Sequence, residues 1–255
     1  MKTLTLSRLP RLDYSSTEAL NTLSTNITFA GSNTRVIMFT SCQPNEGKSY
    51  IVMNLMRAMA DVGKSVVLVD ADFRKSVLVA RYGIQSSDKI LGLSHYLAGM
   101  CQYDDIVYKT DIPGAYMVLA GQDVANSLFL INMPRFPSLI KELAKTFDIV
   151  LIDTPPIGVL IDAAQIAKSC DGVVFTVSDN AISRRELQEA VKQIKATGCP
   201  VLGAILNKVS FDKQSAKKYY HKTYYTHYNK AYYDNSKSRS KDKNPKAVSK
   251  RYERD

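Results

Sequence analysis

Short apolar runs alternate with helical patterns along most of this chain, and this alternation constrains its fold more than any other feature. The apolar runs lie at 35–41, 66–70, 115–120, 149–153, 172–177 and 201–206. Helical patterns lie at 16–30, 48–62, 136–147, 162–168 and 183–197, with a short helix expected within 92–99. Continuous apolar runs are typical of strands that are buried on both faces, as in a parallel sheet covered by helices. We therefore predict an α/β fold whose ligands bind at the carboxyl ends of the strands.

The composition excludes several kinds of chain. Of the 255 residues, 45% are hydrophobic, which excludes wholesale disorder. No apolar run approaches the roughly 20 residues that cross a bilayer, and the first residues do not resemble a secretory signal. The four cysteines lie far apart without the spacing of metal ligands. We expect a soluble cytoplasmic protein with reduced thiols.

Basic charge is concentrated in the last part of the chain. Residues 1–207 carry 20 Lys or Arg and 19 Asp or Glu, whereas residues 208–255 carry 14 and 5. This last segment has no apolar periodicity, and it holds eight of the 15 tyrosines. We predict that it is a disordered tail after a nearly neutral folded body.

The sequence SCQPNEGKS, residues 41–49, joins a predicted strand to a predicted helix and ends like a P-loop. In such a loop, backbone N–H groups cradle phosphates, Lys48 reaches the β and γ phosphates, and the Ser49 hydroxyl binds Mg²⁺. Cys42 stands where Gly or Ala is usual, and Asn45 stands where a second Gly is common. The match to the plain pattern is therefore imperfect, although Asn tolerates positive φ better than most residues.

Aspartates follow two other apolar runs. VVLVDADFR places Asp70, Asp72 and Arg74 at the end of one strand, and alternate residues of an extended segment point the same way. Two carboxylates that share a site favour a bound cation, or they raise one pKa and create a proton acceptor. IVLIDTPP places Asp153 where P-loop ATPases hold the Mg²⁺ shell. An aspartate after a strand is also a common turn or helix cap, but the three motifs in this order are more specific than any one of them.

Together, SCQPNEGKS, VVLVDADFR and IVLIDTPP resemble the Walker A, A′ and B motifs of bacterial protein-tyrosine kinases, a family coupled to capsule and exopolysaccharide export. Further matches lie at GLSHYLAG, at Asp162-Ala163 and at LGAILNKV, which contains Asn207. The tyrosine-rich tail is the family's other hallmark. The resemblance covers the chain from about Glu18 to Tyr233, and it implies a P-loop NTPase fold.

The resemblance implies a role for each matched residue. The residues implied to bind ATP are Asn45, Glu46, Gly47, Lys48, Ser49, Tyr50 and Asn207. Those implied to hold Mg²⁺ are Ser49, Asp72 and Asp153. In catalysis, Lys48 acts at the phosphates, Asp70 accepts the proton of the incoming tyrosine hydroxyl, and Arg74 steadies the transferred charge.

The tail is the implied substrate, phosphorylated by a neighbouring subunit. The expected phosphoacceptors are Tyr219, Tyr220, Tyr224, Tyr225, Tyr228, Tyr232 and Tyr233. Each phosphate adds about −1.5 to −2 charge. A few phosphates would therefore cancel the excess basic charge of the tail and change its affinity for anionic surfaces or partners.

On this resemblance the chain divides into three parts: an N-terminal segment with an oligomerisation-type helix (1–34), a P-loop kinase domain (35–208) and the disordered tail (209–255). It resembles the split cytoplasmic form of the family. That form implies peripheral attachment at the inner face of the membrane through an adaptor of the polysaccharide chain-length or co-polymerase type. A tyrosine phosphatase and a homo-oligomer are further implied partners.

Some positions depart from the family pattern. Relatives carry a Glu-x-x-Arg-x-x-Arg motif that builds a ring of subunits, but here Glu18 is followed by Asn21 and Ser24 in place of the arginines. Ser76 replaces a usual proline, and residues 124–129 replace a Pro-Asn-Pro-x-Glu-Leu segment. The catalytic motifs are therefore retained, and the sequence leaves open whether a ring forms.

Two other functions fit part of the pattern. A partitioning-type or cell-division-site ATPase, acting as a switch without kinase activity, shares the P-loop branch. Such ATPases carry an additional lysine where this chain has Gln43, and they lack a tyrosine-rich tail. A nucleotide-gated binding module is the second alternative, because basic residues among aromatics can bind single strands by stacking. The neutral body argues against nucleic acid as the main ligand.

Overall fold

Six adjacent parallel strands, which reach one edge of the sheet, make up most of a nine-stranded sheet in this computed structural model, which describes residues 1–31 and 34–209. In spatial order these strands are β6 (Ala115–Val118), β3 (Val66–Asp70), β7 (Ile149–Asp153), β2 (Val36–Ser41), β8 (Gly172–Ser178) and the edge strand β9 (Val201–Asn207). The predicted parallel α/β fold is therefore confirmed. The predicted tail lies outside the described residues, apart from Val209.

Three short strands extend the sheet beyond β6. They are β5 (Tyr108–Thr110), β1 (Thr3–Leu6) and β4 (Ile84–Gln85). The β5–β6 and β1–β4 pairs are antiparallel, whereas β1 and β5 are parallel. Because β1 lies in the predicted N-terminal segment 1–34, that segment contributes a strand to the sheet that contains β2, the strand before the P-loop.

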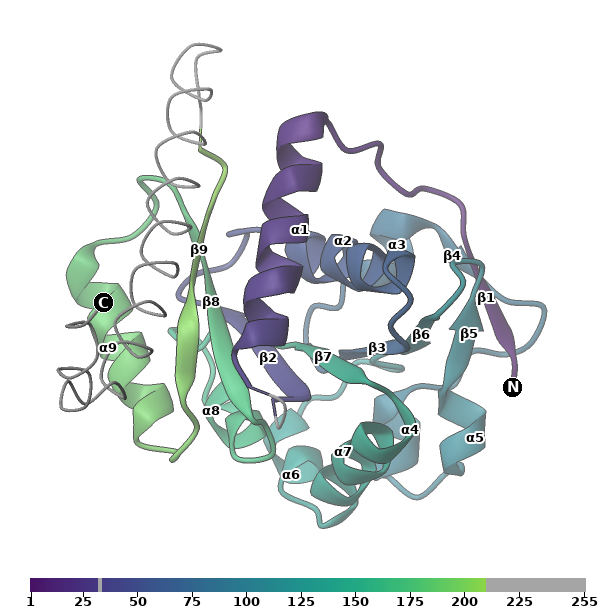
Figure 1. Cartoon of the computed structure of the whole chain (residues 1–255). Coiled ribbons are helices and arrows are strands. Elements are labelled where there is room, and N and C mark those ends of the chain that lie inside the picture. Colours follow the sequence, from purple (N-terminus) through teal and green to yellow (C-terminus); the bar gives the residue numbers. More distant parts are fainter. Residues whose placement is uncertain (32–33, 210–255) are drawn as a thin grey trace, which may run out of the picture. The chain divides into compact units, whose positions relative to one another are not determined.

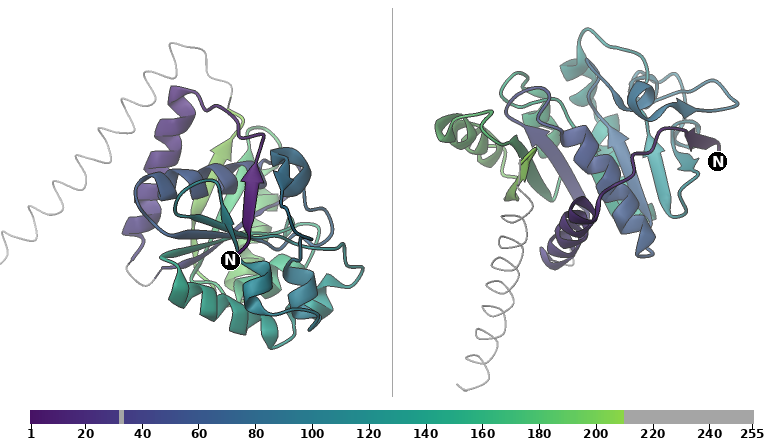
Figure 2. Two further views of the ribbon diagram at one scale, coloured as in Figure 1. Left: turned by 90° about the vertical axis from the view of Figure 1, so that its right-hand side faces the viewer. Right: turned by 90° about the horizontal axis from the view of Figure 1, so that it is seen from above.

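Helices cover both faces of the sheet (Figures 1 and 2). They are α1 (Tyr14–Phe29), α2 (Lys48–Asp61), α3 (Leu78–Tyr82), α4 (Leu93–Leu97), α5 (Tyr103–Ile106), α6 (Ser127–Ile131), α7 (Arg135–Thr146), α8 (Asp162–Ala167) and α9 (Arg184–Lys195). The long helical patterns of the sequence correspond to α1, α2, α7 and α9. Within the described residues, no helix is long and apolar enough to cross a membrane.

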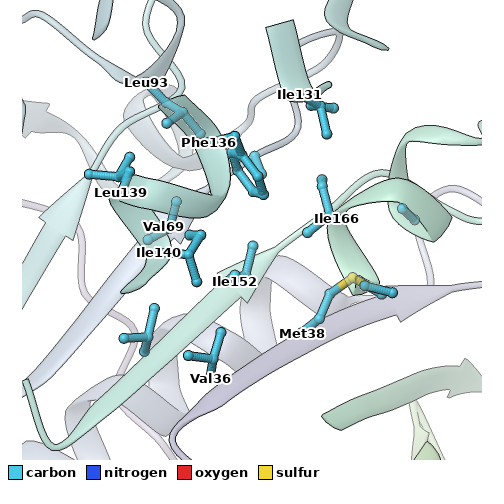
Figure 3. Close-up of a cluster of buried hydrophobic side chains, with 14 of the residues drawn as sticks. Val36, Met38, Val69, Leu93, Ile131, Phe136, Leu139, Ile140, Ile152 and Ile166 are labelled. Atoms are coloured by element: carbon cyan, nitrogen blue, oxygen red, sulfur yellow. The ribbon is translucent and has the colours of Figure 1, made fainter. Parts of the chain in front are cut away.

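Alternate residues of β2, β3, β6, β7 and β8 enter two separate cores, whereas β9 has no buried residue. In β2, Val36 and Met38 face a core that includes Phe136 of α7 (Figure 3), whereas Ile37 and Phe39 face a second core under α1 and α2. Burying a side chain of this size contributes roughly 1.5–3 kcal/mol. Burial on both faces is the physical reason why these strands read as continuous apolar runs.

The parallel arrangement brings the ends of distant motifs to one edge of the sheet. Asp70 at the end of β3 lies directly opposite Asp153 at the end of β7, and Asp153 lies opposite Phe39 of β2. The P-loop leaves β2 two residues later. The site predicted from the sequence therefore lies at the carboxyl ends of β3, β7 and β2, where ligands bind in folds of this type.

Candidate active site

The P-loop turns through two left-handed residues before α2 begins at Lys48. Asn45 has φ 65° and Gly47 has φ 92°, so Asn45 adopts the positive φ that its residue type tolerates. Gly47 is the N-cap residue of α2, and no side chain caps this end of the helix. The first N–H groups of α2 therefore remain available to an anion, which the helix dipole also favours.

Hydrogen bonds of Glu46 connect the P-loop to the ends of β8 and β9. The Glu46 side chain is buried, and its two carboxylate oxygens accept hydrogen bonds from the backbone N–H of Gln43 (2.8 Å) and of Ser178 (3.1 Å). The amide of Asn207, at the end of β9, donates to the Glu46 carbonyl (2.9 Å). Glu46 does not line the cavity described below, so it braces the loop that would hold the nucleotide.

Lys48 joins the three predicted motifs. Its Nζ lies 3.4 Å from Asp72 Oδ2, 3.5 Å from Asp153 Oδ1 and 3.4 Å from Ser49 Oγ. Burial alone would lower the pKa of Lys48, but the charges of Asp153, Asp72 and Asp70 outweigh it and raise that pKa. The side chain therefore stays an ammonium ion among carboxylates.

Asp70 lies beneath this cluster and is only 1% exposed. Its Oδ1 accepts the backbone N–H of Asp72 (3.2 Å), and its Oδ2 accepts the Ser76 hydroxyl. Burial and then the charge of Asp153 raise the pKa of Asp70 to about 7. Burial also raises the pKa of Asp153, against the opposing effect of Lys48. Both carboxyl groups therefore hold a proton more readily than in water, and a cation bound beside them would oppose this effect.

Arg74 lies apart from these contacts. Its Nε is 3.4 Å from Ser127 Oγ and 3.8 Å from Asp162 Oδ2, and the Ser127 hydroxyl also donates to Asp162. Ser127 and Asp162 are both buried, whereas the Arg74 side chain is partly exposed at the cavity. The structure therefore anchors Arg74 to α6 and α8 and not to Lys48 or Asp70.

A cavity of about 530 Å³ opens over the P-loop. The predicted site residues that line it are Asn45, Gly47, Lys48, Ser49, Tyr50, Asp72, Arg74 and Asn207. Asp70, Asp153 and Glu46 do not line it and lie behind its wall. The cavity therefore brings together most of the residues predicted to bind ATP.

Three cations in the cavity wall were missed from the sequence: Lys75, Arg81 and Lys208. Lys208 Nζ donates to the carbonyl of Asn45 (2.6 Å). Lys75 and Lys208 each follow a predicted residue directly, so their position in the sequence was an available signal. Arg81 had none, because only the turn into α3 brings it to the cavity.

Ser49, Asp72 and Asp153 surround Lys48 and are the residues that can hold a metal ion. Asp153 Oδ1 is buried and, beyond its ion pair with Lys48, has no hydrogen-bond partner. Across residues 1–31 and 34–209, no group of three His, Cys, Asp or Glu side chains is arranged as a metal site. An oxygen set of this kind fits Mg²⁺, which usually takes only one or two carboxylates and completes its shell with water and phosphate.

Known proteins are similar to this chain in sequence and fold. Residues 34–199 match the family described as AAA domain. Tyrosine-protein kinase CpsD of Streptococcus agalactiae serotype Ia is 36% identical over 193 residues, which cover 76% of this chain and 82% of the relative. CpsD of Streptococcus pneumoniae serotype 4 is 36% identical over 202 residues, which cover 79% and 87%. The solved BceF tyrosine kinase domain is 30% identical with a TM-score of 0.67, covering 76% of this chain and 78% of that domain. The chain therefore belongs to the family of bacterial capsular tyrosine-protein kinases.

Proposed function

We propose that this kinase uses Mg²⁺-ATP to phosphorylate tyrosines of its own tail and thereby regulates capsular or exopolysaccharide synthesis and export. The observation that carries the proposal is the meeting of Lys48 with Asp72 and Asp153 at the start of α2. The proposed acceptors are Tyr219, Tyr220, Tyr224, Tyr225, Tyr228, Tyr232 and Tyr233.

In this proposal the P-loop holds the phosphates of ATP. The free N–H groups at the start of α2 bind the phosphate oxygens, and Lys48 balances the charge of the terminal phosphates. Ser49, Asp72 and Asp153 would hold Mg²⁺, which supplies positive charge that offsets the charge of the transferred phosphoryl group. A cation bound beside Asp70 and Asp153 would also oppose the protonation that their raised pKa values favour.

Asp70 is the proposed acceptor of the tyrosine proton. Its Oδ2 already accepts a hydroxyl, that of Ser76, so the carboxylate can bond an O–H group in the folded protein. A pKa near 7 suits a group that accepts a proton at neutral pH. The incoming tyrosine hydroxyl would replace the Ser76 hydroxyl at this oxygen, which requires Ser76 to rotate. Arg74 is the proposed stabiliser of the transferred charge from the cavity wall.

The partners are proposed from family membership. We propose that a membrane adaptor of the chain-length or co-polymerase type recruits the kinase to the inner face of the membrane. A tyrosine phosphatase would reverse the modification, and neighbouring copies would phosphorylate each other's tails. On α1, Asn21 is exposed and Ser24 is buried, and neither has a cationic side chain, so a ring would need contacts other than the family's arginines.

The ATPase-switch alternative is less supported. Gln43 stands where partitioning-type ATPases carry their additional lysine, and its Nε2 donates to Glu186 Oε1 of the same chain (3.0 Å). Glu186 also caps α9 through the backbone N–H of Ser183 (2.7 Å). The side chain at this position therefore ties the loop to α9 and carries no charge for a nucleotide.

Transfer of labelled phosphate from Mg²⁺-ATP to tyrosine tests the proposal, with the protein alone and with the cytoplasmic peptide of a candidate adaptor. We expect phosphotyrosine in the wild type, none in Lys48→Met, and none when all seven acceptor tyrosines are changed to Phe. Lys141→Met, an exposed position of α7, is the matched control and should retain the activity. ATP hydrolysis without any phosphotyrosine, under either condition, would overturn the proposal and favour the ATPase switch.

A further inference from the structure

Two cations of the cavity wall have no assigned role. Lys75 and Arg81 line the cavity, and both are exposed. In the part of the chain that the structure describes, neither has a carboxylate within ion-pair distance, whereas Lys48 and Arg74 both do. Exposed cations without a partner beside a binding cavity attract an anion from solution.

The position of these cations favours the acceptor over the nucleotide. Lys48 contacts Asp72 and Asp153, so the terminal phosphate of a nucleotide on the P-loop lies toward β3 and β7. Lys75 and Arg81 belong to the segment from β3 to α3, which lies on that side. The opposite side of the cavity, beyond the P-loop, is formed by the end of β9.

The segments that follow β3 and β7 also contribute apolar surface to the cavity. Val77, Val159 and Leu160 line it, and Val159 is 59% exposed. An aromatic ring can pack on such side chains while an anionic group binds the cations nearby. This combination fits a peptide that contains both a tyrosine and a negative charge.

Residues 219–233, which hold the tyrosine cluster of the tail, contain no Asp or Glu, so the cluster itself supplies this combination only after it has been phosphorylated. The tail carries 14 Lys or Arg against 5 Asp or Glu over residues 208–255, so an unmodified tail is repelled by Lys75 and Arg81. Tyr220, Tyr224, Tyr228 and Tyr232 recur at every fourth residue. In an extended peptide these side chains share one face, about 13 Å apart from one to the next. One phosphotyrosine adds about −1.5 to −2 charge on the same face as the next acceptor.

We propose that Lys75 and Arg81 form a phosphotyrosine subsite, which binds a modified tyrosine of the tail while a tyrosine four residues away is phosphorylated. The inference rests on the proposed tyrosine phosphorylation of the tail. Arg81 presents a guanidinium that can bond two phosphate oxygens at once, and Lys75 adds a second positive charge. The first phosphate on a tail then makes the following transfers faster.

Two synthetic peptides of residues 217–230 test this subsite. In both, Tyr224 is the only acceptor and Tyr219, Tyr220 and Tyr225 are changed to Phe; position 228 carries either phosphotyrosine or Phe. The enzyme is the full chain with its own seven acceptor tyrosines changed to Phe, so that it competes with neither peptide. We expect kcat/KM for the phosphorylated peptide to exceed that for the other by about tenfold, and added salt to reduce the difference.

Three variants test which residues bind the phosphate group of the phosphotyrosine. Arg81→Gln and Lys75→Gln should each bring the ratio of the two kcat/KM values toward one. Arg185→Gln is the matched control, because Arg185 is 88% exposed on α9 and pairs with Glu189 outside the cavity. This control should retain the tenfold ratio.

The outcomes separate this inference from the proposed function. If neither peptide nor the wild-type tail receives phosphate from ATP, the kinase proposal itself fails. If both peptides react equally, or the ratio persists in Arg81→Gln and Lys75→Gln, only the subsite is overturned. A raised KM for ATP in these variants, with an unchanged ratio, would also overturn it and would assign the two cations to the nucleotide.

Discussion

The side-chain amide of Asn207 occupies the space that a Cβ atom on Gly47 would need. The two residues are 160 positions apart, at the end of β9 and at the start of α2, and the same amide donates to the carbonyl of Glu46 (2.9 Å). Gly47 also has φ 92°, where residues with a Cβ are strained. Glycine is therefore required at position 47 for two reasons. The backbone has a positive φ there, and the Asn207 side chain leaves no room for a Cβ atom.

Gly47→Ala should weaken nucleotide binding by at least about tenfold, because the loop or Asn207 must move to admit the methyl group. Titration with a fluorescent ATP analogue measures the loss. Gly63→Ala is the matched control: Gly63 has φ 84°, but nothing lies within 4 Å of its Cβ position. It should lower the free energy of unfolding by about 1 kcal/mol and leave nucleotide affinity unchanged. Wild-type affinity in Gly47→Ala would show that crowding by Asn207 has no effect.

Ser127→Ala should lower the free energy of unfolding by about 1–3 kcal/mol, because Asp162 is buried and loses the hydroxyl that donates to its Oδ2. Arg74 also loses one of the two groups that hold it at the cavity. Chemical denaturation measures the change. The control is Ser138→Ala, an exposed serine of α7 whose hydroxyl bonds the Pro134 carbonyl, and it should stay within about 0.5 kcal/mol of the wild type. Equal stability of the two variants would contradict the role given to Ser127.

The strands β2, β3, β6, β7 and β8 were predictable because burial on both faces leaves a continuous apolar run in the sequence. The strands β1, β4 and β5 were not, since each has only two to four residues and exposes part of them. The short helices α3, α5 and α6 have four or five residues, too few to show a helical period. Their positions depend on packing against the rest of the sheet and not on a local pattern.

The site was predictable where a residue ends a strand or belongs to the loop that follows it. The parallel directions of β2, β3 and β7, together with the P-loop turn after β2, bring Lys48, Asp72 and Asp153 together. The contact of Ser127 with Asp162 was not predictable, because it joins α6 to α8 across 35 residues. The orientation of the Glu46 side chain was not predictable either. Its carboxylate accepts the backbone N–H of Ser178, and no pattern near Glu46 in the sequence indicates this contact.

Asp148→Asn should destabilise the protein at neutral pH but not in acid. The backbone N–H and the hydroxyl of Ser65 both donate to Asp148 Oδ2 (2.9 Å each), and these bonds lower the pKa of Asp148. The stabilisation is therefore complete above the unfolded-state pKa of about 3.9 and is lost as the pH falls through the lower pKa of the folded state. We expect a difference of about 0.5 kcal/mol at pH 7, reduced because the carboxylate is largely exposed.

Chemical unfolding of wild type and Asp148→Asn between pH 7 and pH 3 measures this difference. Asp123→Asn is the control, because Asp123 is exposed in the loop between β6 and α6. Its difference from the wild type should stay near zero over the same range. A difference for Asp148→Asn that grows as the pH falls would contradict the sign derived from the Ser65 bonds.

Glu46→Gln should weaken nucleotide binding although Glu46 does not line the cavity. Both carboxylate oxygens accept backbone N–H groups, those of Gln43 (2.8 Å) and Ser178 (3.1 Å). A glutamine has one acceptor oxygen, so its NH₂ group must face one of these N–H donors, and a buried donor left without an acceptor costs about 1–3 kcal/mol. The loop then separates from β8 or changes its turn at Asn45, and the N–H groups that would cradle phosphate lose their alignment.

The same nucleotide titration, together with chemical unfolding, measures both effects of Glu46→Gln. Glu189→Gln, which removes the charge of an exposed residue of α9, should change neither. Glu46→Gln could lower stability and still bind nucleotide as the wild type does. This result would show that the hydrogen bonds of Glu46 stabilise the contact with β8 but do not set the conformation of the P-loop. A fall in affinity of about tenfold would instead show that a buried carboxylate outside the cavity sets the geometry of the phosphate site.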